Sequence, residues 1–131
     1  MKITRQFTFH AAHRMRGHSK GEQLHGHTYK VEITLKGTFD DLNPKFGYLR
    51  DFSEIEKVFE EKVFNKLDHK YLNDVKGLKY TTTEELAAWI FEKMYDHFKS
   101  TLNQVTVGAT PISYATVTYA DLKDYKKWKR K

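Results

Sequence analysis

The sequence predicts a single α+β domain, in which an antiparallel sheet is covered on one face by a pair of helices. Two alternating strand patterns lie near the amino terminus, two helical patterns occupy the middle, and two short strand patterns follow. The predicted order is therefore ββααββ. With 131 residues, 39% of them hydrophobic and 15% aromatic, the protein has enough apolar material for one compact core. We expect the domain to span residues 1–120 and a basic C-terminal tail to follow at 121–131.

The clearest strand pattern covers residues 29–35, where apolar and polar side chains alternate with a period of two. Residues 2–10 carry a similar pattern, so we expect the two segments to pair antiparallel across the loop at 14–24. Two further strands are predicted around residues 105–107 and 115–119. Between them lies a sequence typical of a bulge or tight connection, Gly108-Ala109-Thr110-Pro111.

Two sequences of the capping-box type mark the predicted helices. One precedes a helical stripe that ends near Leu67 and reads Ser53-Glu54-Ile55-Glu56. The other precedes a stripe that ends near Phe98 and reads Thr82-Thr83-Glu84-Glu85. Each stripe is apolar on one side, so both helices can cover the same face of the sheet. We expect the other face to be partly apolar and to be buried, with the sheet edges, against further copies of the protein, which predicts a homo-oligomer.

Composition restricts the classes of function. The sequence contains no cysteine, which excludes disulfides, thiolate metal ligands and a cysteine nucleophile. No apolar run approaches the roughly 18–20 residues that cross a bilayer, and the opening residues lack the apolar segment of a signal peptide, so we expect a cytoplasmic protein. The formal charge is +6, but six basic and two acidic side chains lie in residues 121–131. This pattern is typical of a solvated basic end and argues against a nucleic-acid-binding face spread over the fold.

Three histidines are candidate metal ligands. His25 and His27 stand two residues apart at the start of the second predicted strand, so their side chains project to the same side. The predicted antiparallel pairing brings the end of the first strand, with His13, close to them. An H-x-H pair alone is equally consistent with two ordinary strand histidines, but the third histidine favours a metal site. Three neutral imidazoles with a fourth position open predict a catalytic zinc ion.

The other histidines have different expected roles. We expect His10 to face away from His13, His18 to be solvated in a polar loop, and His97 to lie on a helix surface. His69 follows Asp68 where the first helix ends, and the carboxylate could orient the imidazole as a general acid or base. The alternative is that His69 is only a cation placed favourably at a helix end.

Glu22 is a candidate proton acceptor. It lies three residues before His25, in the loop that leads into the predicted metal site. The alternative is an ordinary exposed loop acid.

Together these segments resemble the 6-pyruvoyl tetrahydropterin synthase family, which includes the QueD-type 6-carboxy-tetrahydropterin synthases. The resemblance covers nearly the whole sequence, and the motifs occur in the order and at the spacing of the family. The matching segments are Phe9-His10-Ala11-Ala12-His13, Leu24-His25-Gly26-His27-Thr28-Tyr29, Asp51-Phe52, Leu67-Asp68-His69-Lys70-Tyr71-Leu72-Asn73, Thr82-Thr83-Glu84 and Thr110-Pro111.

The resemblance implies the tunnelling fold, a four-stranded antiparallel sheet with two helices. Three subunits would close a barrel, two trimers would stack into a hexamer, and the active sites would lie at subunit interfaces. It also implies the substrate 7,8-dihydroneopterin triphosphate, whose side-chain hydroxyls would bind zinc on the three histidines before triphosphate is eliminated. By match, Asp68 and His69 would shuttle protons. The match also places Thr82, Thr83, Glu84 and Thr110 in the substrate pocket.

Two positions depart from the family pattern. Related enzymes have a cysteine shortly before the H-G-H motif, whereas Glu22 gives this sequence the pattern E-x-x-H-G-H. That pattern resembles a cysteine-free branch in which glutamate replaces the thiol and the side chain is cleaved to give 6-hydroxymethyl-7,8-dihydropterin. Ala109 stands where the family has a glutamate that holds the pterin, and losing such a charged acceptor costs about 2–5 kcal/mol of binding. Glu84 could compensate.

Three hypotheses follow. The first is a zinc-dependent pterin lyase. The second is a divergent or repurposed tunnelling-fold protein that binds another heterocycle, which Ala109 and the missing cysteine motivate. The third is a basic nucleic-acid-binding domain, which rests on the tail and on Tyr125 and Trp128 within it.

Overall fold

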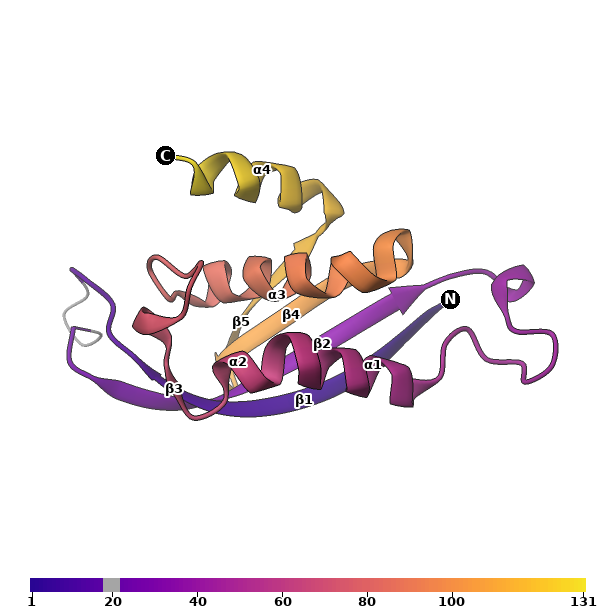
Figure 1. Ribbon diagram of the computed structural model, residues 1–131, viewed down its shortest axis with the longest axis horizontal. Helices are drawn as coiled ribbons and strands as arrows, with labels where there is room; N and C mark the ends of the chain where they lie inside the picture. The colour runs from indigo at the N-terminus through magenta and orange to yellow at the C-terminus, as the bar shows by residue number, and fades with distance from the viewer. Residues whose placement is uncertain (18–21) are drawn as a thin grey trace.

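The computed structural model describes residues 1–17 and 22–131 and has the expected α+β architecture (Figure 1). Short 3-10 turns at Phe39–Asp41, Leu72–Asp74 and Lys99–Thr101 connect the larger elements. In sequence order these are β1 (Lys2–His13), β2 (His25–Lys36), α1 (Phe52–Phe59), α2 (Asn65–Leu67), β3 (Lys70–Tyr71), α3 (Thr83–Phe98), β4 (Leu102–Thr110), β5 (Ser113–Thr118) and α4 (Tyr119–Lys129). The predicted ββααββ order is therefore confirmed, with a short strand and a helix added to it.

The sheet has the strand order β3-β1-β2-β4-β5. β1 and β2 form a long antiparallel pair whose register runs from Lys2 opposite Lys36 to His13 opposite His25, as the sequence predicted. β2 pairs with β4 and β4 with β5, again antiparallel. The register of the last pair shifts between Gly108 and Thr110, which is the predicted bulge.

The expectation of four strands was wrong by one. β3 adds a fifth strand at the edge, where Lys70 and Tyr71 pair parallel with Ala11 and Ala12 of β1. A strand of two residues is too short to show any alternation, so the sequence pattern could not reveal it.

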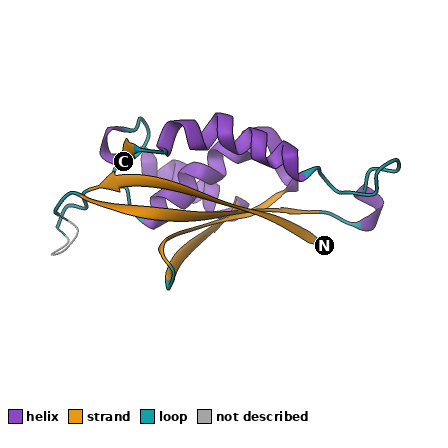
Figure 2. Cartoon of the chain, turned by 90° about the horizontal axis from the view of Figure 1, so that it is seen from below, coloured by secondary structure: helices purple, strands orange, loops and turns teal. Residues whose placement is uncertain are grey.

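The helices lie on one side of the sheet (Figures 1 and 2), as predicted. Every second residue of the long strands points into this layer, and most of those in the middle of the sheet are buried; Phe9, Tyr29 and Val107 are 0% exposed. The opposite face is mainly polar, with a few apolar side chains such as the exposed Tyr114, so it is partly apolar as expected. Across it, hydroxyl pairs join Thr4 to Thr34 and Thr106 to Thr116, each at 2.9 Å.

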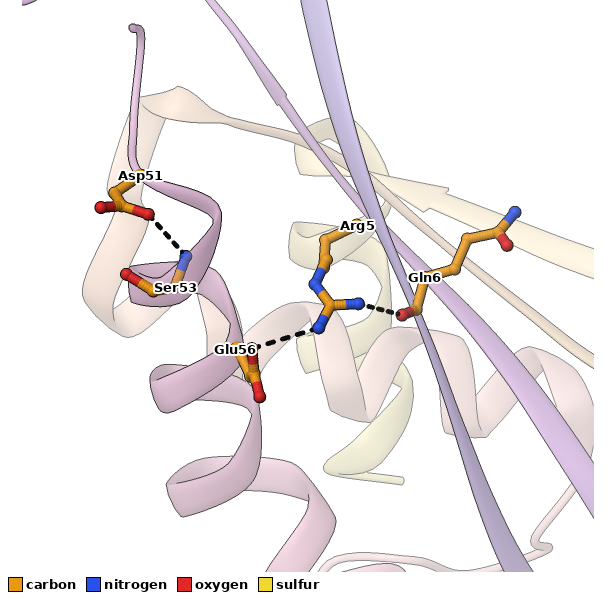
Figure 3. Close-up of polar contacts among 5 residues, drawn as sticks. All are labelled: Arg5, Gln6, Asp51, Ser53 and Glu56. Atoms are coloured by element: carbon orange, nitrogen blue, oxygen red, sulfur yellow. Dashed lines mark hydrogen bonds and ion pairs between the residues drawn. The ribbon is translucent and has the colours of Figure 1, made fainter. Parts of the chain in front are cut away.

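The first helix begins two residues earlier than its predicted cap. Asp51 is the N-cap, and its carboxylate accepts the Ser53 backbone N–H at 2.9 Å (Figure 3). Arg5 of β1 also reaches this helix and pairs with Glu56 at 3.1 Å (Figure 3).

A π-helical segment at Glu60–Phe64 joins α1 to α2. The apolar stripe has a strict four-residue spacing, which on an ideal α-helix drifts by about 40° per step. The wider π turn offsets that drift. It keeps Ile55, Phe59, Val63 and Leu67 in the core.

The second predicted helix, α3, begins as the sequence indicated, because Thr82 is its N-cap and accepts the Glu85 backbone N–H at 3.2 Å. Most of the segment described above as a basic tail forms α4. The carboxylate of Asp121 accepts the Thr118 backbone N–H at 2.9 Å at its start, and Leu122 and Tyr125 are buried against the domain. The other side chains of α4 are mostly charged, so the average hydropathy of the segment is low. That average gives no sign of the narrow apolar face that Leu122 and Tyr125 form.

Within the described ranges, no helix combines the length and the apolar character that a bilayer crossing requires.

Candidate metal centre and active site

Three histidines converge at the end of the β1–β2 pair. His13 lies directly opposite His25 in the register, and His27 follows on the same side of β2. One ligand atom from each of the three lies within 4.8 Å of the others. The Nε2 atoms of His13 and His25 are 2.9 Å apart. The predicted convergence of the three histidines is thus present.

Hydrogen bonds behind the cluster orient two of the rings. The Nδ1–H of His13 donates to the Thr81 carbonyl at 3.0 Å, and the Nδ1–H of His25 donates to the Gln23 carbonyl at 2.8 Å. A carbonyl can only accept, so in both neutral rings Nε2 carries a lone pair and no proton. Two lone pairs that face each other at this distance repel unless a cation lies between them, so the arrangement suits a metal ion.

The surroundings also favour the neutral form that binds metals. Burial lowers the pKa of His13 below its ordinary 6.5, although its hydrogen bond to the Thr81 backbone acts in the opposite direction. Burial, followed by the charge of His25, lowers the pKa of His27 as well. On a tetrahedral zinc ion, two ligand nitrogens lie roughly 3.3 Å apart, so a small opening of the cluster would accommodate one.

A buried carboxylate supports the loop behind His13. Glu85 is 4% exposed, and it accepts the backbone N–H groups of Lys79, Tyr80 and Thr81 at 2.7, 2.8 and 2.7 Å. Thr81 has a φ of 61°, a conformation that a β-branched residue adopts only when its surroundings impose it. Glu85 therefore fixes the carbonyl that holds His13. Sequence reasoning missed this role, although a glutamate on the apolar side of a helix start was visible.

Asp68 and His69 form the predicted pair. The Asp68 Oδ2 and His69 Nδ1 atoms are 2.7 Å apart, and Asp68 Oδ1 accepts the His10 backbone N–H at 3.0 Å. That backbone hydrogen bond is the main cause of the lowered pKa of the Asp68 carboxyl; burial opposes it, and the pairing with His69 adds to the lowering. The His69 side chain is 76% exposed, and its φ of 58° directs it out of the helix end. Asp68 thus orients the imidazole, and within the part of the protein that the structure describes no hydrogen bond engages its Nε2.

The pair does not lie in the metal cluster of the same protomer. His13 points into the helix layer, whereas His10 points to the open face, as expected from their spacing. The ring centroid of His69 is 5.8 Å from that of His10, and both residues line a shallow groove of about 570 Å³ that His27 and Thr28 also line. The three-histidine group that the described residues form contains neither Asp68 nor His69.

Glu22 is exposed and accepts the Gly17 backbone N–H at 3.2 Å. It is not a member of the histidine group among the described residues. His18 lies outside the described residues, so its predicted position is not assessed. His97 is on the surface of α3, as expected, where its Nε2 lies 2.9 Å from Glu54.

The residues that the sequence assigned to the substrate pocket fall into two places. Thr82 and Glu84 line a hollow beside α4, whereas Ala109 and Thr110 line another, of about 530 Å³, on the open face of the sheet. Thr83 is half-buried in the first turn of α3. Within a single chain the other four residues therefore line two separate hollows.

The hollow that contains Ala109 has charged side chains that the sequence analysis did not single out. Lys30 and Glu32 of β2 line it, and Glu32 is half-buried. The carboxylate that shares this hollow with Ala109 is thus Glu32 and not Glu84.

Fold and site define a class of protein: an α+β sheet domain with a three-histidine cluster suited to a metal ion and a separate carboxylate–imidazole pair. The family model of 6-pyruvoyl tetrahydropterin synthase matches residues 2–120. The chain belongs to this family, and it is a lyase of the tetrahydropterin synthase type with the tunnelling fold.

Individual relatives agree with this assignment. The chain is 36% identical over 115 residues to the 6-carboxy-5,6,7,8-tetrahydropterin synthase of Synechocystis sp., covering 86% of this chain and 89% of the relative. It is 36% identical over 93 residues to the dihydroneopterin monophosphate aldolase of Pyrococcus furiosus, covering 71% and 74%. The solved structure of Caenorhabditis elegans 6-pyruvoyl tetrahydropterin synthase superposes with a TM-score of 0.80 at 26% identity, covering 90% of this chain and 94% of that one.

Proposed function

We propose that this protein is a zinc-dependent lyase that acts on 7,8-dihydroneopterin triphosphate. The observation that carries the proposal is the three-histidine cluster, in a family whose named members include tetrahydropterin synthases. Neutral nitrogen donors with one position left for substrate are typical of catalytic zinc. When bound, zinc would act as a Lewis acid that makes the C–H and O–H groups next to the pterin ring of the substrate more acidic.

Asp68 and His69 would move the proton. Asp68 holds the Nδ1 side of His69, so the free Nε2 can accept or donate a proton at the substrate. Because the described three-histidine cluster contains neither member of this pair, we propose that a second copy completes each site. The proposed assembly is a hexamer built as a dimer of trimers, in the cytoplasm.

Glu22 would act as the base on the metal side. The absence of cysteine leaves a carboxylate as the acceptor that precedes the H-G-H motif. Its exposed position fits a group that meets substrate at the mouth of a site. The similarity to an archaeal aldolase supports cleavage of the side chain, whereas the similarity to a 6-carboxy-tetrahydropterin synthase supports elimination of triphosphate. Both outcomes belong to the proposal.

For the substrate pocket, we propose Thr82, Thr83 and Glu84 from one copy, and Ala109 with Thr110 from another. This arrangement would unite the two hollows at an interface between copies. Glu32 would contribute the carboxylate that Ala109 lacks.

Mass spectrometry of the products from dihydroneopterin triphosphate tests the proposal. Elimination releases inorganic triphosphate, whereas cleavage of the side chain leaves the phosphates on a two-carbon aldehyde and gives 6-hydroxymethyl-7,8-dihydropterin. We expect one of these product sets from the zinc-loaded protein and none from a His27→Ala variant. An intact substrate after incubation with zinc-loaded protein would contradict the proposal.

Ala109 favours a second candidate, a repurposed member that binds a different heterocycle. An Ala109→Glu variant discriminates between the two. If it binds dihydroneopterin no better than the parent, the second candidate gains. Nucleic acid binding has less support, because Tyr125 is 6% exposed and cannot stack on bases.

A further inference from the structure

A cavity of about 810 Å³ lies beyond β3, between the end of the first helix, α3 and α4. It adjoins the candidate active site, because Lys70 and Tyr71 line both this cavity and the groove beside His69. None of the motifs discussed above accounts for it. Its composition is unusual in that five lysines contribute to its lining: Lys66, Lys70, Lys76, Lys93 and Lys129.

The positive charge of this cavity is only partly neutralised. Two carboxylates also line it, and one of them, Glu92, pairs with Lys129 at 3.2 Å. In the described part of the protein, no ion pair engages the other four lysines. Burial and then the charge of Lys66 lower the pKa of Lys93, which shows how closely the cations are gathered. Such a cluster favours a multiply charged anion.

The indole of Trp89 forms part of the cavity lining. The Lys93 ammonium lies 5.0 Å from the centre of the indole ring, which restricts where it points. Gly77 has a φ of 94°, and a Cβ there would lie 3.1 Å from the indole Nε1, so the glycine lets the loop approach the ring edge. The indole N–H adds a neutral donor to the charged ones around the cavity.

We propose that this cavity binds a linear polyphosphate. Lysines are point charges that contact phosphate oxygens without demanding one geometry, and five of them come from separate elements around one hollow. That distribution fits an extended anion with several charges better than a single carboxylate. Two sources share this chemistry: the phosphate tail of a substrate held beside His69, and free inorganic polyphosphate. The first source rests on the function proposed above.

Titration calorimetry of the zinc-loaded protein with inorganic tripolyphosphate tests the site. The test variant is Lys66→Ala with Lys76→Ala, both exposed positions whose truncation leaves the core intact. The matched control is Lys45→Ala with Lys57→Ala, which removes the same charge outside the cavity. Tripolyphosphate that binds to the zinc ion itself contributes equally in the test and control variants, so it does not affect their comparison. We expect the test variant to bind about tenfold more weakly and the control within about twofold of the parent.

The sources are separated by the KM for dihydroneopterin triphosphate. A KM that rises only in the test variant assigns the site to the substrate tail, and an unchanged KM with weaker tripolyphosphate binding assigns it to free polyphosphate. Both results support the site. Equal losses in the two variants, or no loss in either, would overturn it. If the protein turns over no pterin, the calorimetry still shows whether the cavity binds tripolyphosphate. Failure of the proposed function can therefore be told apart from failure of the proposed site.

Discussion

The three-histidine cluster and the Asp68–His69 pair lie at the same end of the sheet, but their surroundings differ. His13 is 3% exposed, and a hydrogen bond to Thr81 holds its ring against the core. His69 is 76% exposed at its side chain, and a single carboxylate orients it. One chain therefore assembles the three-histidine cluster by itself. The proposed proton-transfer pair instead presents the His69 ring outward, where a substrate or a second copy can meet it.

Removing a metal ligand should give the largest effect. We expect His25→Ala to weaken zinc binding by more than about a hundredfold, because two donors cannot replace three. Competition with a chromophoric chelator measures the affinity. His10→Ala is the matched control, since His10 lies on the opposite face of the same strand pair. Equal losses of zinc affinity in the two variants would show that the two faces of this strand pair do not differ in metal binding.

Loosening the loop behind the cluster should have a smaller effect. We expect Glu85→Gln to weaken zinc binding by about tenfold. The carboxylate offers two acceptor oxygens to the three backbone N–H groups, whereas the amide offers only one. The visible spectrum of the cobalt-substituted protein should shift as well, since the ligand geometry changes. Glu84→Gln, at the exposed neighbouring position, controls for the loss of charge. An unaltered cobalt spectrum in the Glu85 variant would argue against a positioning role.

A substitution on the polar face of the sheet should have a smaller effect, and the affected quantity is the affinity for the pterin. If Glu32 compensates for Ala109, Glu32→Gln should weaken dihydroneopterin binding by about five- to tenfold, because a hydrogen bond to a charged acceptor is lost. Fluorescence titration of the zinc-loaded protein checks this expectation, with Glu56→Gln on α1 as the control. Unchanged binding in the Glu32 variant would leave the hollow beside Ala109 without a role in recognition.

The pH dependence of stability should show the smallest effect. Burial lowers the pKa values of His13 and His27 in the folded protein, so the unfolded protein binds protons more readily there. The metal-free protein should therefore be most stable above pH 6.5 and lose stability as the pH falls through and below that value. Thermal unfolding between about pH 8 and pH 5 measures this. In a His13→Asn variant the stability should depend less steeply on pH. An equally steep dependence would show that the lowered pKa of His13 is not its cause.

Much of the fold followed from the sequence because its strands and helices are strongly patterned. The alternation at residues 29–35 and the capping box at Thr82 identified elements whose packing agrees with their local preference. β3 and the exposed start of α1 did not follow. A two-residue strand has no period, and the Asp51 cap competes with an equally plausible serine two residues on.

The candidate site was predictable in its ligands and not in its supports. His13, His25 and His27 could be joined because strand register alone brings them together. Thr81 and Glu85 act through backbone groups of an irregular loop, for which the sequence has no periodic signal. The lysine-lined cavity depends on five separate elements that meet only in the folded protein.

The separation of the metal centre from the proton-transfer pair is tested most directly by the zinc affinity of a His69→Ala variant. The account predicts one zinc ion per protomer, bound within about twofold of the parent affinity, even though turnover should fall by about a hundredfold or more. Zinc affinity that falls as it does in His25→Ala would contradict the account, because it would make His69 part of the metal centre.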